Sequence, residues 1–154
     1  MKERTRARSL ALQVLYEIDM SDHLPGIVFT ERLRDFPLSE KGNKAEELQE
    51  FARSIIFGII PITEKLDHAI AKYAPDWPLD QISPIDRNIL RIAFWEFGIS
   101  QETPVKVAIN EAVELAKTYG SDAAPSFVNG VLGSLAKHKN DIIQSIQSEE
   151  KKDA

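Results

Sequence analysis

Three arginines at alternate positions, Arg4, Arg6 and Arg8, open the chain. A guanidinium presents a planar fork of donors that suits phosphate oxygens. Arginines near the start of a helix oppose the helix macrodipole, so a helix beginning near Thr5 is less stable for carrying them, and such costly choices often mark function. Tyr16, on the same expected helix, offers a ring on which an unpaired base could stack. The segment therefore indicates a surface for single-stranded RNA rather than a reader of duplex DNA.

These residues also have a plainer interpretation, in which the arginines are a solvated charged terminus and Tyr16 is a half-buried ring with its hydroxyl in water. The charge distribution bears on the choice. Residues 1–8 carry a net charge of +3, whereas the whole chain carries −5 and the remainder therefore −8. A basic end on an acidic body favours a local anion site, because the acidic remainder repels phosphate elsewhere. From the residues alone, both interpretations stay open.

Other kinds of chemistry have little support in this sequence. It has no cysteine, which excludes disulfides and thiolate metal sites, and its three histidines are isolated from one another. It contains no phosphate-binding glycine loop and no nucleophile motif. We therefore expect a protein that is not an enzyme and that has no metal or cofactor. No apolar run is long enough for a membrane span, so a soluble, cytoplasmic protein is expected.

Apolar residues recur at three- and four-residue steps along most of the chain, and no strand-like alternation of convincing length occurs. The pattern predicts an all-α protein. Trp77, between two prolines, is expected to fill the edge of the core. The expected helices are 5–20, 27–36, 44–74 with a kink or break at Pro61, 83–97 with Ser83 as its cap, and two in 104–136 joined at Gly120 in a left-handed conformation.

Two features of these helices predict specific contacts. Gly130 and Gly133 lie beside an apolar stripe, which predicts the close approach of another helix, because glycine is costly inside a helix. Arg91 lies within a strongly apolar helix, where a buried charge needs a partner. Glu96 or a carboxylate on a neighbouring helix, such as Glu111, is the expected partner.

Two adjacent segments carry a resemblance to a known family. VAINEAVELAKTYG at 107–120, followed by FVNGVL at 127–132, resembles the signature of the NusB family of bacterial antitermination factors. Residues 84–97 and the segment RTRARSLALQVLY at 4–16 are also similar. The resemblance implies about seven helices in two packed helical bundles. Residues 1–139 are then a single domain, and 140–154 a polar C-terminal tail that is partly helical or frayed.

The resemblance also implies a function. Members of this family bind the boxA sequence of nascent RNA together with the ribosomal protein that doubles as NusE. The complex helps RNA polymerase to read through terminators, notably in ribosomal RNA transcription. Carried over by position, the RNA-binding residues are Arg4, Arg6, Arg8, Gln13 and Tyr16 on the first helix, and Lys117, Tyr119, Phe127 and Asn129 at the corner of the last two helices. The residues expected to face NusE are Asp86 and Arg87.

Two other functions compete with antitermination. NusB-like domains also occur in some RNA cytosine methyltransferases, so the chain could be an RNA-binding accessory module of such a system. It could also be a protein-interaction scaffold whose arginines are merely solvated. The dependence of RNA binding on salt separates the scaffold from the RNA binders, since phosphate contacts weaken steeply as salt increases.

Overall fold

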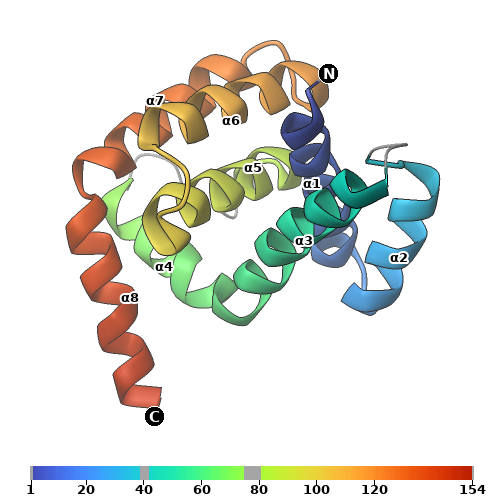
Figure 1. Cartoon of the computed structure of the whole chain (residues 1–154). Coiled ribbons are helices and arrows are strands. Elements are labelled where there is room, and N and C mark those ends of the chain that lie inside the picture. Colours follow the sequence, from blue (N-terminus) through green and yellow to red (C-terminus); the bar gives the residue numbers. More distant parts are fainter. Residues whose placement is uncertain (1, 39–41, 75–80, 154) are drawn as a thin grey trace. The chain divides into compact units, whose positions relative to one another are not determined.

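A computed structural model of the chain describes residues 2–38, 42–74 and 81–153 (Figure 1). Throughout these ranges the regular elements are helices and no strand occurs, so the all-α prediction is confirmed. The chain divides into two compact units, residues 1–60 and 61–154, and each is a helical bundle. Trp77 lies outside the described residues. The assignment of residues 1–139 to one domain stays a prediction.

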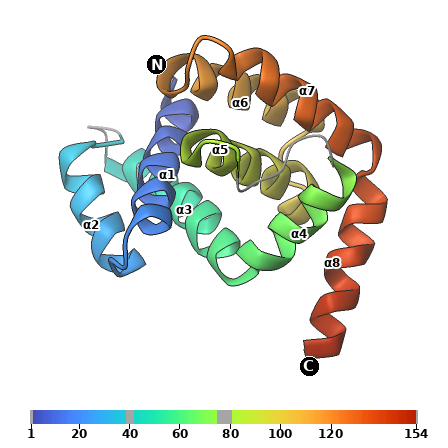
Figure 2. The same cartoon turned by 180° about the vertical axis from the view of Figure 1, so that it is seen from behind.

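The first unit consists of α1 (Glu3–Met20), α2 (Pro25–Asp35) and α3 (Gly42–Ile59). Helix α1 packs against both of the others, and Figures 1 and 2 show it between α2 and α3. Its apolar face is buried, with Leu10 and Val14 fully inaccessible to solvent. The helix begins two residues before Thr5, and Lys2 at its N-cap makes no side-chain capping bond. The helix thus begins earlier than the start near Thr5 that the sequence suggested.

The long helical stretch at 44–74 is interrupted at Pro61, as predicted. Helix α3 ends at Ile59, a 3₁₀ turn covers Ile60–Ile62, and α4 runs from Thr63 to Tyr73. Proline has no N–H to donate to the preceding turn, and its ring crowds the carbonyl four residues earlier. The boundary between the two compact units falls at the same place, between Ile60 and Pro61.

Helix α5 (Pro84–Phe94) lies at the centre of the second unit. It packs against α4, α6 (Val105–Tyr119) and α7 (Ala124–Lys137). As predicted, Ser83 caps it: the Ser83 hydroxyl oxygen accepts a hydrogen bond from the Asp86 N–H at 3.1 Å. Seven consecutive residues, from Asn88 to Phe94, are buried. A helix that is apolar on most of its sides is thus covered on most of its sides.

The sequence predicted that the helical segment ends before Gly98, but the segment extends further. It continues as a π-helical segment, η2, over Trp95–Ser100, and Gln101 then adopts a left-handed conformation with φ 57°. Glu96 is buried in this segment and accepts a hydrogen bond from the Thr103 hydroxyl at 2.9 Å. The hydrogen bond satisfies a polar group that would otherwise be costly to bury.

Three glycines of this unit differ from the predictions in their backbone conformation or in their surroundings. Gly120 is extended rather than left-handed, with φ −94° and ψ −179°. A Cβ at this position would lie 2.5 Å from the Cβ of Ala124, so the tight corner between α6 and α7 excludes a side chain. At Gly130 and Gly133 a Cβ would meet no atom of the described residues within 4 Å. The predicted close helix approach at those two glycines is therefore wrong.

The buried Arg91 has a partner that the sequence did not indicate. Its guanidinium is paired with the carboxylate of Asp67 on α4, through Nε–Oδ1 at 2.8 Å and Nη2–Oδ2 at 2.5 Å. A third donor, Nη1, reaches the side-chain oxygen of Asn88 at 3.0 Å. The prediction of a carboxylate partner was correct in kind, but Asp67 takes the place of Glu96 or Glu111. The pair joins α4 to α5.

The last helix, α8 (Lys139–Asp153), extends over most of the predicted tail. It packs against α4, and Ile142 and Ile146 on its inner side are buried. Two buried isoleucines four residues apart give this otherwise polar helix a narrow apolar stripe. No helix in the described part of the chain is long and apolar enough to cross a membrane.

Candidate nucleic-acid interface

Helix α1 places the three predicted arginines against aromatic rings of the first unit. The Arg4 Cζ atom lies 4.5 Å from the centroid of the Phe51 ring on α3, and the Arg8 Cζ atom lies 5.0 Å from the same centroid. The Arg6 Cζ atom lies 3.9 Å from the centroid of Phe36. All three distances are within the range in which a cation is attracted to the face of a ring.

The three arginines differ in how much they offer to a ligand. Arg4 is exposed and Arg6 is half-buried, but Arg8 is only 3% exposed. Arg6 also donates its Nε–H to the carbonyl oxygen of Pro37 at 2.6 Å. Arg4 is therefore the arginine best placed to meet a phosphate, and the burial of Arg8 gives it a structural part in the packing of α1 on α3.

A lysine that the sequence reasoning missed lies at the same end of α1. The Lys44 ammonium, at the start of α3, is 3.1 Å from the carboxylate of Glu3. Glu3 is the single acidic residue among residues 1–8, so its pairing with Lys44 removes a negative charge from beside the arginines. No local pattern could have revealed this residue, because the contact depends on how α3 packs against α1.

Gln13 and Tyr16 lie further along α1. Gln13 is half-buried and is engaged in an interaction within the protein, and Tyr16 is 37% exposed. Ten residues separate Arg6 from Tyr16, which is about 15 Å along a helix. An extended single strand of RNA covers such a distance with a few nucleotides. The partial exposure of the Tyr16 ring fits either of the two interpretations offered for it.

The other predicted RNA contacts surround the corner between α6 and α7 in the second unit. Lys117 is exposed and paired with Glu114 one turn earlier on α6, at 3.0 Å. Tyr119 and Phe127 are half-buried, and Asn129 is exposed. Exposed ion pairs of this kind contribute little energy, about 0.3–0.5 kcal/mol. Lys117 can therefore exchange its partner for another anion at small cost.

Asp86, a residue predicted to face a protein partner, lies against the same corner. A Cβ at Gly120 would be 3.3 Å from the Asp86 Oδ1 atom. This oxygen is buried, and within the described ranges it has no hydrogen-bond partner. Burial raises the pKa of the Asp86 carboxyl, and a hydrogen bond with Ser83 partly opposes the increase. The neighbouring Arg87 is half-buried and makes interactions of its own.

The structure thus gathers the predicted residues into two sets, one in each unit. Arg4, Arg6, Arg8, Gln13 and Tyr16 belong to α1 in the first unit. The second unit brings the start of α5 to the corner between α6 and α7. The members of this second set are Asp86, Arg87, Lys117, Tyr119, Phe127 and Asn129.

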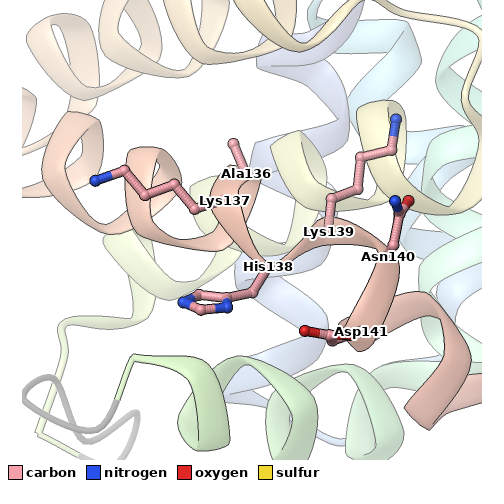
Figure 3. A pocket seen from close by; sticks show the side chains of 6 residues that line it. All are labelled: Ala136, Lys137, His138, Lys139, Asn140 and Asp141. Carbon is pink, nitrogen blue, oxygen red and sulfur yellow. The ribbon is translucent and has the colours of Figure 1, made fainter.

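A polar pocket of about 370 Å³ lies at the junction of α7 and α8. Figure 3 shows that the side chains of Lys137 and Lys139 point away from each other and that His138 points in a third direction. The His138 ring stacks on Tyr73 with a centroid distance of 5.4 Å. The charged groups do not converge on one point, so the pocket does not indicate a small-molecule site. In the described ranges, no cluster of three or more His, Cys, Asp or Glu side chains could hold a metal.

The structure defines a class of protein by its fold: an all-helical protein of two helical bundles, with arginines at the start of its first helix. The family model described as the NusB family matches residues 5–137, and the chain belongs to this family. It is 46% identical over 134 residues to the transcription antitermination protein NusB of Roseiflexus sp. (strain RS-1), covering 86% of this chain and 90% of the relative. It is 41% identical over 145 residues to the NusB protein of Bacillus subtilis (strain 168), covering 94% and 100%.

Solved structures show the same similarity. A crystal structure of the antitermination factors NusB and NusE in complex with double-stranded RNA contains a chain that superposes with a TM-score of 0.77 and 28% identity. The superposition covers 89% of this chain and 98% of that one. The solution structure of NusB from Aquifex aeolicus has a TM-score of 0.74 at 28% identity, covering 89% of each chain. The predicted family and its fold are therefore confirmed.

Proposed function

We propose that this chain is a transcription antitermination factor that binds boxA RNA of nascent transcripts, notably ribosomal ones, together with a NusE protein. The observation that carries the proposal is the group of arginines on α1, held against aromatic rings at the basic end of an acidic chain. Family membership and the similarity to a NusB–NusE–RNA structure support it. The chain acts by binding rather than by catalysis, within the antitermination complex of RNA polymerase in the cytoplasm.

The residues of α1 have different roles in this proposal. Arg4 and Arg6 contribute salt-dependent affinity for phosphates that is independent of base sequence. The Tyr16 ring stacks on an unpaired base, a contact worth about 1–3 kcal/mol when fully engaged. Gln13, on the same helix, supplies amide groups for the edge of a base. Arg8 holds α1 against Phe51 and contributes to the positive potential of the surface.

The second unit contributes a further RNA contact and the protein partner. Lys117 and Asn129 supply polar groups at the corner of α6 and α7, and Tyr119 and Phe127 supply rings. Asp86 and Arg87, at the start of α5, face the NusE protein. The net negative charge of residues 9–154 attracts a basic ribosomal protein and steers the encounter.

The small size of the basic cluster has a consequence for affinity. Arg4 and Arg6 alone neutralise few phosphates, and the acidic remainder of the chain repels the rest of the RNA. Affinity for RNA alone is accordingly modest, and the NusE partner completes the binding surface. Tight binding of boxA RNA by this chain alone, unchanged by NusE, would contradict this part of the proposal.

Fluorescence anisotropy with a labelled boxA RNA and a scrambled RNA, each with and without NusE, tests the proposal. We expect selective binding of boxA RNA that NusE strengthens. The double substitution Arg4→Ala/Arg6→Ala should weaken binding about tenfold or more and make its salt dependence shallower by about two phosphate contacts. Arg34→Ala is the matched control, because Arg34 is an exposed arginine on α2, outside the predicted site.

The outcomes separate the proposal from its rivals. Equal affinity for boxA and scrambled RNA, or an Arg4→Ala/Arg6→Ala variant that binds like the wild type, would refute it. Binding of NusE with no salt-dependent RNA binding would instead identify a protein-interaction scaffold.

A further inference from the structure

Phe51 on α3 lies against two arginines of α1 at once. Its ring centroid is 4.5 Å from the Arg4 Cζ atom and 5.0 Å from the Arg8 Cζ atom. Phe51 is itself half-buried, and the helix that carries it packs against α1. The ring is therefore part of the framework that supports the start of α1.

The spacing of the two arginines explains why a ring is useful there. Arg4 and Arg8 are four residues apart, so they lie on the same face of α1, and like charges at this spacing repel each other. The negative face of an aromatic ring attracts both guanidiniums and offsets the repulsion. Since Arg8 is buried and Arg4 is exposed, the ring supports a single arginine that faces solvent.

A guanidinium on a ring keeps its ability to bind phosphate. The ring occupies one side of the guanidinium, and the N–H donors that do not face the ring stay available to a phosphate. Arg6 has a different arrangement, since it donates its Nε–H to the Pro37 carbonyl. A side chain held in its bound geometry loses less entropy when the ligand arrives.

We propose that Phe51 is a positioning residue of the RNA site, whose ring holds the Arg4 guanidinium ready for a phosphate of single-stranded RNA. Phe51 acts through Arg4 and does not contact the RNA. This inference rests on the function proposed above and adds to it a residue from a helix outside the arginine-rich segment.

The substitution Phe51→Leu keeps apolar bulk at the position and removes the ring. We expect the affinity of the full chain for labelled single-stranded boxA RNA to fall about fivefold, and Phe51→Tyr to restore it. Phe57→Leu is the matched control on the same helix. The Phe57 ring makes an edge contact with Phe29, 6.4 Å between centroids, and should leave RNA binding unchanged when it is removed.

A double-mutant cycle distinguishes positioning from structural damage. In an Arg4→Ala background, Phe51→Leu should cause no further loss of affinity, because the side chain that the ring positions is absent. An equal loss in both backgrounds would overturn the inference, as would a Phe51→Tyr variant as weak as Phe51→Leu.

An NMR measurement on the wild type gives an answer even if Phe51→Leu does not fold. The Arg4 Nε–H resonance should be shifted by the ring current, and an unshifted resonance would also overturn the inference.

The same set of variants shows which proposal fails. If Arg4→Ala weakens RNA binding but Phe51→Leu does not, the role of Phe51 is wrong and the proposed function stands. If Arg4→Ala, Arg6→Ala and the double variant all bind boxA RNA like the wild type, the proposed function itself is wrong.

Discussion

At the scale of single residues, the three arginines of α1 have the same side chain and different surroundings. Arg4 is exposed above Phe51, Arg6 is held by Phe36 and the carbonyl of Pro37, and Arg8 is buried. The chemical capacity of a guanidinium to bind phosphate is available only where its donors reach solvent. The three arginines look equivalent in the sequence, but they differ in how many N–H donors they can offer to a phosphate.

Asp86 gives a prediction at this scale. Burial raises the pKa of its carboxyl, so ionising this carboxyl costs more free energy in the folded state than in the unfolded state. The stability cost is absent at low pH, where the carboxyl is neutral in both states, and appears as pH increases through the raised pKa. We expect Asp86→Asn to be more stable than the wild type at pH 7, by up to about 1 kcal/mol. The advantage should shrink as pH decreases through the raised pKa and should be lost below about 4, the ordinary pKa of an aspartate, where the carboxyl is neutral in both states.

Urea unfolding at pH 7 and at pH 3.5 measures this difference. Asp122→Asn is the control, because Asp122 is an exposed aspartate at the same corner. A lower free energy of unfolding for Asp86→Asn at pH 7 would show that the ionised carboxylate is stabilising where it lies.

At the scale of helices, an ion pair between the buried Arg91 and the half-buried Asp67 joins α5 to α4. Arg91 makes two hydrogen bonds to Asp67 and one to Asn88, and Asn88 in turn donates to the Pro84 carbonyl at 2.8 Å. The network satisfies a charge that the apolar surroundings of α5 would otherwise penalise. It links the start of α5, where Asp86 and Arg87 lie, to a neighbouring helix.

Removing one member of this pair should be costly. We expect Asp67→Ala to lower the free energy of unfolding by about 3 kcal/mol, because it leaves the Arg91 guanidinium buried without its carboxylate. The double variant Asp67→Leu/Arg91→Met should lose much less, since it removes both charges and keeps their volume. Urea unfolding followed by circular dichroism gives both values. A double variant no more stable than Asp67→Ala would show that the pair itself is needed.

At the scale of the whole molecule, the chain combines a basic N-terminal end with an acidic remainder and folds into two helical units. The family match covers residues 5–137, and α8 lies beyond it. This helix nevertheless buries Ile142 and Ile146 in the second unit. The helix therefore belongs to the core of that unit.

The contribution of α8 to stability can be measured at Ile142. We expect Ile142→Ala to lower the free energy of unfolding of the second unit by about 3 kcal/mol, the usual cost of emptying a fully buried isoleucine site. Ile143→Ala, at a half-buried position on the same helix, should cost less. Tryptophan fluorescence reports on this unit through Trp95, which begins η2. Equal losses for the two variants would show that α8 does not pack through Ile142.

The features that the sequence determined by itself depend on residues that are close together along the chain. The apolar period, the break at Pro61 and the Ser83 cap depend on residues within one or two turns, and all three appear in the structure. The family signature at 107–132 depends on residue identity alone. Tertiary structure decided the partner of Arg91, the burial of Arg8 and of the Asp86 Oδ1 atom, the pairing of Lys44 with Glu3, and the rings against which the arginines lie. Each of these depends on helices distant in the chain packing together, and helical periodicity shows which face of a helix is buried but not which residue meets it.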